Sequence, residues 1–394
     1  MIEQGVQPLN EPVHLTWAEI HLDNLRKNVD NIRRLCSNKQ KIMAVLKADG
    51  YGHGAVKIAL FLQRLGIDAF AVANVDEAVL LRKNGITIPI LILGIVPCGQ
   101  MEDIFHYQLT PTVCTLETAQ ELSRAASARQ MVLSVHVRVD IGLGSIGVLP
   151  HQCVPFVEAV AGLPNLALEG IYTHLTTAYQ EDDHGVQRDL QTFDSLLLRL
   201  RQKGIDVPLV HVASSPAILR YPQAHYQMVR AGIILYGLPA IHAPSPLPFY
   251  PVMTLKSKVV FIKDVGEGET VGYVHGYRLN RRTRVATVPF GYGDALFFFY
   301  LNGGEVLLHG RRAPILGRPM MDHFMVDVSH IPEVKVGDEV VIIGQQGKAV
   351  LTAEEMAERA GIGRLNADCV CMLTQRVPRI YIDSRGFEER RDEG

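Results

Sequence analysis

One lysine stands where an apolar segment gives way to a glycine-rich one. Lys47 follows the apolar run 42–46 and is followed at once by Ala-Asp-Gly-Tyr-Gly-His-Gly, residues 48–54. An amine at the rim of an apolar strand is partly desolvated, which favours its neutral and nucleophilic form. Glycines let the backbone approach a ligand closely. The pattern is compatible with a catalytic amine beside a bound small molecule, but a lysine that ends a strand is more often a solvated cap.

Polar groups also follow four later apolar runs. They are the segment 138–147 (RVDIGLGSIG), His174, the serines 214–215, and Arg230 with the amides of 232–233. A serine at the start of a short helix, close to backbone amides that follow another strand, is typical of a phosphate-binding cradle. Several such groups at successive strand ends indicate a functional face more strongly than any one of them does.

The elements that must position these groups alternate between strand and helix from about residue 20 to 240. Eight short apolar runs predict buried strands at 42–46, 69–73, 90–93, 110–113, 132–139, 168–173, 209–213 and 228–234. Helical patterns, such as those at 115–128 and 186–203, separate most of them. The number and length of these units favour an α/β fold with a (β/α)₈ barrel over an open doubly wound sheet. In such a barrel the catalytic groups lie at the carboxyl ends of the strands.

The pattern changes after Leu238. The segment 239–251 carries five prolines and predicts a linker, and the chain beyond it is rich in short β-runs. These runs lie at 252–261, 284–288, 305–308, 313–316, 325–328 and 339–343. A capping box at Thr352 and Glu355 predicts one helix, and we expect Cys369 and Cys371 on a strand.

These patterns predict two domains and a short tail. We expect a barrel at 12–245, a mostly β C-terminal domain at 246–386 and a frayed tail at 387–394. The first strand, at about 12–20, is able to pack with the C-terminal domain instead of the barrel.

The composition of the 394 residues excludes several classes of protein. There are 39 Lys and Arg against 41 Asp and Glu, a formal net charge of −2, so no basic face for nucleic acid or an anionic membrane is expected. The first residues lack the pattern of a signal peptide, and no apolar run is long enough to span a bilayer. Six scattered cysteines are expected to be reduced, with no metal site. We therefore expect a cytoplasmic enzyme.

The chain resembles the alanine racemases of fold type III, which depend on pyridoxal 5′-phosphate (PLP). The resemblance runs from Thr16–Ile20 to Arg376–Arg379. Its strongest segments are AVLKADGYGHG at 44–54, VRAGI at 229–233 with YG at 236–237, VGY at 271–273, PFGYGD at 289–294 and GRPMMD at 317–322.

The resemblance implies how the barrel would bind the cofactor. Lys47 would carry PLP on its amine and also serve as one of two acid/base groups. The phosphate would be bound by Tyr51, Ser215, Gly232 and Ile233. Arg230 would face the pyridine nitrogen, supported by His174. A guanidinium keeps its proton, so the pyridine nitrogen would stay unprotonated and the cofactor would be a weaker electron sink, which suits racemisation better than transamination.

The resemblance also implies a second base and a dimer. Tyr273 of a partner subunit would be that base, since inversion at carbon needs a base on each face of the substrate. A tyrosine with a pKa near its ordinary value of about 10 is a poor base, so cationic neighbours such as a His174–Arg230 pair are expected. Tyr292 and Met321 would bound the substrate pocket of this homodimer, and Asp322 would orient its neighbours.

Four residues depart from the family pattern. Arg138 stands where a lysine, often carbamylated, is usual, and Ser145 stands where an arginine contacts the cofactor and the substrate carboxylate. Met320 replaces a cysteine, and Ala367 replaces a tyrosine at the entrance to the site. We expect Arg138 to take over part of the cationic role. The space at Ser145 and Ala367 suggests that a larger or polar amino acid, such as serine, is accepted.

The implied function is therefore racemisation of alanine or a related small amino acid by Lys47 and Tyr273. The alternatives are a racemase of serine or a larger amino acid, an aldolase-type PLP reaction, and a PLP-binding protein without catalysis. PLP-dependent decarboxylases on this scaffold place a glutamate at the ring nitrogen, where this chain has Arg230. A PLP carrier is usually a barrel alone, so the β-rich portion argues against that alternative.

Overall fold

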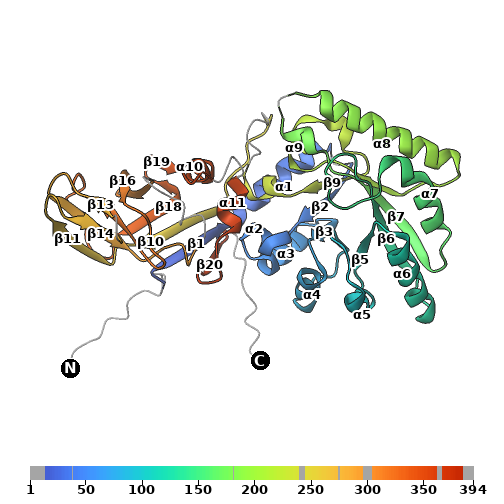
Figure 1. Cartoon of the computed structure of the whole chain (residues 1–394), viewed down its shortest axis with the longest axis horizontal. Coiled ribbons are helices and arrows are strands. Elements are labelled where there is room, and N and C mark those ends of the chain that lie inside the picture. The colour runs from blue at the N-terminus through green and yellow to red at the C-terminus, as the bar shows by residue number, and fades with distance from the viewer. Residues whose placement is uncertain are drawn as a thin grey trace. The chain divides into compact units, whose positions relative to one another are not determined.

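The computed structural model describes residues 14–37, 39–180, 182–238, 245–273, 276–295, 304–361 and 366–384 (Figure 1). The chain divides into two compact units, which are considered separately. The barrel unit comprises Leu22–Val252, and the β unit joins the chain up to His21 with the chain from Met253 onward. Half of the expected linker, 239–244, and the expected tail at 387–394 lie outside the described residues.

The barrel unit is built on eight parallel strands, so the predicted fold class is confirmed. They are β2 (Lys41–Val45), β3 (Ala69–Val72), β4 (Ile90–Ile92), β5 (Thr110–Val113), β6 (Leu133–Arg138), β7 (Leu166–Tyr172), β8 (Leu209–His211) and β9 (Met228–Ala231). Neighbours in the sequence are neighbours in the sheet, and β9 pairs with β2. The amides of Gln227 and Arg230 donate to the carbonyls of Val210 and Ala213, which brings β9 beside β8 and nearly closes the cylinder.

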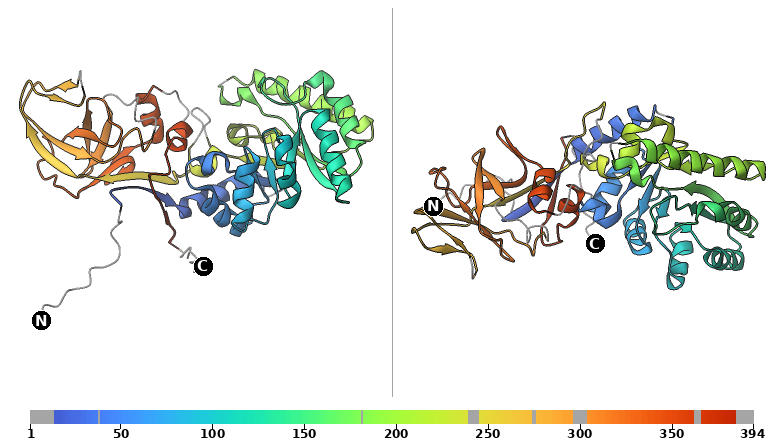
Figure 2. Two further views of the ribbon diagram at one scale, coloured as in Figure 1. Left: turned by 60° about the horizontal axis from the view of Figure 1, so that its bottom comes forward. Right: turned by 45° about the horizontal axis from the view of Figure 1, so that its top comes forward.

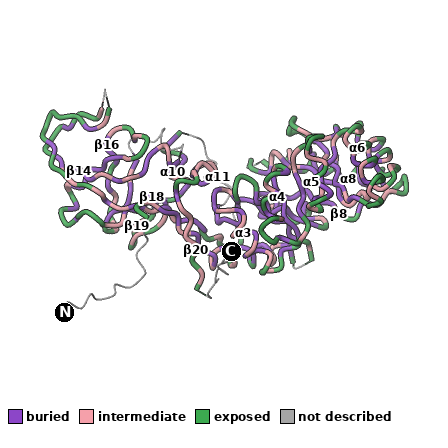
Figure 3. Tube along the Cα trace, turned by 90° about the horizontal axis from the view of Figure 1, so that it is seen from below, coloured by how far each residue is buried: buried purple, intermediate pink, exposed green. Residues whose placement is uncertain are grey.

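Helices lie outside these strands (Figures 1 and 2). They are α1 (Leu22–Leu35), α3 (Ala55–Arg64), α4 (Val75–Lys83), α5 (Met101–His106), α6 (Leu116–Ala128), α7 (Pro150–Ala161), α8 (His184–Gln202) and α9 (Ser215–Arg220), besides the short turn α2 (Lys47–Tyr51). Strands covered in this way are buried on both faces, and all four residues of β3, Ala-Phe-Ala-Val, are buried. Figure 3 colours the buried parts of the chain purple. No helix in the described ranges is both long and apolar enough to cross a membrane.

The described half of the proline-rich segment is fixed to the barrel unit. Buried Asn28 on α1 donates to the carbonyls of Leu235 and Tyr250 at 2.9 and 2.8 Å and accepts from the Tyr250 amide. Asn31, one turn further along, donates to the Pro248 carbonyl at 2.7 Å. These side chains satisfy backbone groups of a segment that forms no sheet, so residues 245–251 are an ordered connection.

The β unit contains one large mixed sheet and a small hairpin. Its strands are β1 (Thr16–His21), β10 (Met253–Lys258), β11 (Phe261–Val265), β12 (Thr270–Val271), β13 (Tyr277–Arg278), β14 (Thr283–Val288), β15 (Glu305–Leu308), β16 (Arg311–Leu316), β17 (Phe324–Asp327), β18 (Glu339–Gln346), β19 (Ala349–Leu351) and β20 (Arg379–Ile382). The order in the large sheet is β11-β14-β17-β16-β15-β18-β10-β1-β20, with β19 on β18. The first strand of the chain, β1, therefore pairs with β10 and β20.

Two predictions for this unit were wrong in detail. Cys369 and Cys371 lie on a helix, α11 (Asn366–Cys371), and not on a strand. Their alternate spacing suggested a strand, but Cys369 and the adjacent Val370 are both buried, which a helix allows and a half-buried strand does not. The single run 252–261 is divided between β10, which pairs with β1 and β18, and β11, which pairs with β14; residues 259 and 260 belong to neither strand.

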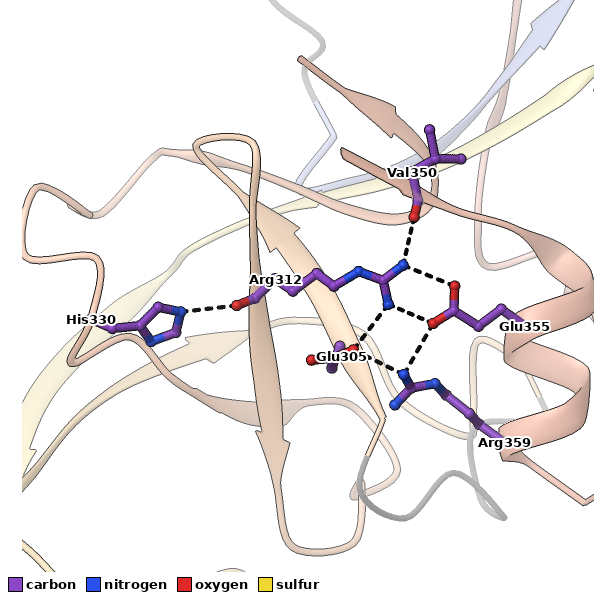
Figure 4. Close-up of polar contacts among 6 residues, drawn as sticks. All are labelled: Glu305, Arg312, His330, Val350, Glu355 and Arg359. Atoms are coloured by element: carbon purple, nitrogen blue, oxygen red, sulfur yellow. Dashed lines mark hydrogen bonds and ion pairs between the residues drawn. The ribbon is translucent and has the colours of Figure 1, made fainter. Parts of the chain in front are cut away.

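The predicted helix at Thr352 is present as α10 (Ala353–Arg359). The Thr352 hydroxyl accepts from the Glu355 amide at 3.2 Å, so half of the capping box forms. The Glu355 carboxylate turns instead to Arg312 on β16, which binds both of its oxygens, and to Arg359 (Figure 4). Glu305 on β15 accepts from both arginines, so four side chains tie α10 to the sheet.

Candidate active site

Lys47 begins a left-handed turn at the carboxyl end of β2. The backbone angle φ is positive at Ala48, Asp49, Gly50 and Tyr51, with values of 52°, 53°, 62° and 53°. For a residue with a Cβ atom this conformation costs about 1–2 kcal/mol. Three of the four residues carry that cost, so other contacts must hold the turn.

Carboxylates provide these contacts. Glu77, in the first turn of α4, accepts from the Ala48 amide at 2.8 Å and from the Ala73 amide at 2.7 Å. It thereby joins the loop after β2 to the loop after β3. Within the turn, Asp49 accepts from the Ala55 amide at 2.7 Å. Sequence reasoning missed Glu77, whose only signal was an acidic residue three positions after the helix cap Asn74.

The expected desolvation of Lys47 is not found within the barrel unit. Its side chain is exposed, although the five residues before it, 42–46, are all buried. The strand ends at its rim, and the residues that follow curve away in the left-handed turn. The barrel therefore presents the amine at an accessible place, and any desolvation must come from groups that bind over it.

Tyr51, Ser215 and Gly232 come together as predicted for an anion cradle. A Cβ atom on Gly232 would lie 2.9 Å from the Tyr51 hydroxyl and 3.7 Å from Ser215 Oγ, so only glycine leaves room for the hydroxyl at this place. Buried Ser215 accepts from the amides of Gly232 and Ile234 at 3.1 and 3.4 Å. The 3₁₀ helix η4 (Ile233–Tyr236) begins at Gly232, and the first amides of a helix favour an anion. These residues fit a phosphate group.

Arg230 on β9 is 5% exposed and its terminal nitrogens are fully used. Nη1 donates to His211 Nδ1, at 3.1 Å, and to the His211 carbonyl. Nη2 donates to the carbonyls of Thr173 and Val212 at 2.6 and 3.2 Å. Of the five N–H groups of a guanidinium, only Nε–H is left without a partner in the described part of the chain. The side chain is thus held so that one N–H group remains for a ligand.

The side chain that contacts Arg230 is that of His211, and the support predicted from His174 stays a prediction. His211 on the neighbouring strand β8 makes that contact, because its ring points into the barrel at the level of the guanidinium. Burial, and then the charges of Arg230, Arg138 and Lys47, lower the pKa of His174 to about 4. The low pKa disfavours the charged form of His174 at neutral pH.

Arg138 lies at the carboxyl end of β6 and reaches toward Ser145. Its Nη2 is 3.4 Å from Ser145 Oγ, and its guanidinium carbon is 5.9 Å from the centre of the Tyr172 ring. Asp140 shapes the intervening loop by accepting from the amides of residues 142–144. The two departures from the family pattern at 138 and 145 are therefore in contact.

Tyr273 belongs to the β unit and stands at the tip of the β12–β13 hairpin, 72% exposed. The base of the hairpin is anchored, since Val271 and Leu279 belong to a buried cluster against which Met320 also packs. Gly276 is required for the turn, because a Cβ atom there would lie 2.4 Å from the Val271 carbonyl oxygen. Buried residues therefore anchor the two strands of the hairpin, and the phenol that follows β12 is exposed.

The remaining predicted residues of the β unit lie on two loops joined through their backbones. The Tyr292 amide donates to the Met320 carbonyl at 3.1 Å, so Tyr292 is next to the segment that carries Met321. Asp322 accepts from Arg376 at 2.8 Å, and Arg376 is 3.3 Å from Asp294. Arg376 was not predicted. Ala367 lies on α11, a short side chain at its first turn.

Comparison with known proteins gives the same family over both units. Residues 20–240 match the family described as "Alanine racemase, N-terminal domain", and residues 252–381 match "Alanine racemase, C-terminal domain". The alanine racemase of Halothermothrix orenii is 41% identical over 372 residues, which cover 94% of this chain and 98% of the relative. Alanine racemase 1 of Clostridium acetobutylicum is 40% identical over 373 residues, 93% and 95% of the two chains.

Solved structures agree with the sequence comparison. The structure of an alanine racemase from Clostridium difficile 630 has a TM-score of 0.88 at 37% identity and covers 95% of this chain and 97% of its own. An alanine racemase from Bacillus anthracis, solved with bound L-Ala-P, has a TM-score of 0.88 at 35% identity, with 95% and 97% covered.

Proposed function

The chain belongs to the alanine racemase family, and we propose that it interconverts L- and D-alanine with PLP bound in the barrel. The observation that carries this proposal is Arg230, buried and held by four hydrogen bonds with only Nε–H left for a ligand. When bound, PLP supplies an electron-withdrawing ring that makes the substrate Cα–H acidic. An arginine opposite that ring nitrogen cannot protonate it, which favours simple proton return at Cα.

The barrel residues would bind the cofactor at two ends. The amine of Lys47 is accessible and would hold the aldehyde carbon. The Tyr51 hydroxyl, the Ser215 hydroxyl and the amides of Gly232 and Ile233 would bind the phosphate, because the two hydroxyls and the start of η4 lie together at Gly232. His174 is neutral beside these cations and would contribute a polar wall without adding charge.

Two bases would act on opposite faces of the substrate Cα. Lys47 Nζ would remove or return a proton on one face, and Tyr273 Oη of a partner subunit would do so on the other. Tyr273 supports this role because its phenol is exposed at the tip of an anchored hairpin. We therefore propose a homodimer with shared sites, working in the cytoplasm, in which Tyr292 and Met321 bound the pocket and Asp322, paired with Arg376, fixes the loop between them.

Arg138 would bind the substrate carboxylate. It is half-buried, it touches Ser145, and no carboxylate binds it directly in the described residues. Ser145 would help to orient it. Because Ser145 and Ala367 are small, we expect the protein to racemise serine too, at a lower rate than alanine. Strict refusal of serine would contradict this part of the proposal.

The test is a chiral product assay with purified protein, PLP and one alanine enantiomer at a time. Wild type is expected to yield the racemate from either enantiomer, and Lys47→Ala is expected to yield none. Lys57→Ala, on the adjacent helix α3, is a matched control that removes a lysine outside the site and should leave the rate unchanged. A keto acid formed from alanine in place of the opposite enantiomer would support another PLP reaction and contradict the proposal. The aldolase-type alternative needs a β-hydroxy amino acid, so the assay is repeated with serine, where release of formaldehyde and glycine would support that alternative.

A further inference from the structure

A line of buried polar side chains crosses the barrel from Arg230 to its opposite end. His211 Nε2 lies 2.8 Å from His136 Nδ1, and His136 Nε2 lies 3.6 Å from a carboxylate oxygen of Glu169. Both histidines are almost fully buried. Glu169 and His136 line a small cavity with Lys41 at the amino ends of the strands, away from Lys47. A carboxylate at one end of the barrel is thus connected to the cation at the other.

The direction of every hydrogen bond in this line follows from Arg230. A guanidinium only donates, so the His211 Nδ1 that it contacts must accept, and the His211 proton is on Nε2. Nε2–H then donates to His136 Nδ1, which must also be unprotonated. The His136 proton is therefore on Nε2, where it faces the Glu169 carboxylate. The opposite direction would set two N–H groups against each other at Arg230.

The surrounding residues hold the His136 and His211 rings in these positions. His211 is stacked on Tyr172, with ring centres 4.7 Å apart and planes 13° apart, and the Tyr172 hydroxyl is fixed by Thr112 at 2.9 Å. His136 occupies space that only a glycine leaves, since a Cβ atom on Gly170 would lie 2.5 Å from its ring. The line is therefore built by the packing of four neighbouring strands, β5 to β8.

We propose that Glu169, His136 and His211 form a one-way hydrogen-bond chain that positions Arg230 and supplies its remote counter-charge. Among the described residues no carboxylate touches Arg230 directly, and an adjacent one would compete for the Nε–H group that the ligand needs. A carboxylate at the end of two neutral imidazoles stabilises the buried cation without such competition. Glu169, His136 and His211 are thus positioning residues; their effect on catalysis rests on the proposed function, whereas their protonation does not.

The direct test is the protonation of the two rings in the full chain. We would label histidine with ¹⁵N, record long-range ¹H–¹⁵N spectra with and without PLP, and assign the two rings from the signals lost in His136→Asn and His211→Asn. Both rings are expected to be neutral with the proton on Nε2 throughout the neutral pH range. A proton on Nδ1 of either ring, or a doubly protonated His136, would overturn the chain whatever the activity of the protein.

A set of variants tests its effect on Arg230. His136→Leu removes the acceptor for His211, and kcat for alanine is expected to fall about tenfold with KM nearly unchanged. In His136→Asn the amide oxygen can accept in place of Nδ1, so most of kcat should return, and Glu169→Gln should lie between the two. If His136→Leu fails to fold, Glu169→Gln replaces it, because Glu169 is only half-buried. Equal kcat in wild type and Glu169→Gln, or equal losses in His136→Leu and His136→Asn, would contradict the positioning role.

Discussion

The two halves of the proposed site differ in how far a single chain completes them. In the barrel unit Arg230, Ser215 and the turn after Lys47 are held by hydrogen bonds to groups of the same chain. In the β unit Tyr273 is 72% exposed and Met321 is 50% exposed, on loops whose bases are anchored. The cofactor half is pre-organised by contacts within the barrel unit, whereas the other half presents exposed side chains.

The two units differ because a buried charged group and an exposed polar group need different surroundings. A buried cation needs its partners from its own fold, because leaving its donors unsatisfied costs several kcal/mol. An exposed phenol beside an anchored strand costs little and can complete a site in a second copy of the chain. If the site is shared in this way, a substitution in the barrel unit of one subunit and one in the β unit of the other should leave one intact site in the dimer.

The largest change in racemase activity is expected between the homodimers of two variants and their mixed dimer. Co-expression of Lys47→Ala with Tyr273→Phe, followed by purification through two different tags, gives dimers in which one site has both an intact lysine and an intact tyrosine. Each homodimer should be inactive, and the mixed dimer should regain about half of the wild-type activity.

A matched control for the mixed dimers distinguishes a site shared by two subunits from a site that lies within one chain. Wild type co-expressed with the double variant Lys47→Ala/Tyr273→Phe contains no intact shared site and should be almost inactive. If each chain used its own Tyr273, this pair would keep half of the activity and the first pair would have none. That reversed outcome would show that each site is completed by a single chain.

A smaller effect is expected from Tyr273→Phe alone. Losing a general base typically lowers the rate about 10²–10⁴-fold, so racemisation should fall by that factor in both directions, as an equilibrium constant of one requires. Lys47 is untouched and should still exchange the Cα hydrogen of one enantiomer in D₂O, with retention. Proton NMR of each enantiomer measures this. Exchange of both enantiomers, or of neither, would contradict the two-base assignment.

Within the barrel, Glu77→Gln should have a moderate effect. An amide can accept from only one of the two backbone N–H groups that the carboxylate joins, and it turns a donor toward the other. We expect the free energy of unfolding to fall by about 1–3 kcal/mol and the rate to fall about tenfold, as the turn after Lys47 loosens. Urea unfolding measures the free energy, and the racemisation assay measures the rate. Glu117→Gln, an exposed acid in the first turn of α6, is the control and should change neither.

The smallest effect is expected in the β unit, at the ion pairs of Figure 4. Arg312 and Glu355 are 38% and 27% exposed, so Glu355→Gln should lower the free energy of unfolding by about 1 kcal/mol or less, with no effect on the rate. Arg312 lowers the pKa of Glu355 below its ordinary value of 4.5. The stabilisation is therefore present above that pH and is lost as the pH falls through the lowered pKa. Urea unfolding at several pH values should show the two proteins converging in acid; a difference that grows in acid would refute this.

Particular residues show how far sequence reasoning reached. The eight strands were predictable because strands covered on both faces read as short apolar runs, and Lys47, Tyr51, Ser215 and Gly232 were recognisable from the motifs around them. His211, the histidine that contacts Arg230, was not predicted, because it carries no motif and is one of fifteen histidines. Glu77 was missed for the same reason, since its partners Ala48 and Ala73 reveal nothing by their types.

The sequence by itself determined the two-unit plan, the family and the residue types of the site, because apolar spacing and glycine turns are local properties of the chain. Only the tertiary structure decided which side chains meet. The partners of Arg230 come from β7 and β8, and His136 reaches His211 across 75 positions of sequence. Such contacts depend on the register and closure of the barrel, which place strand residues at one level regardless of their separation in the chain.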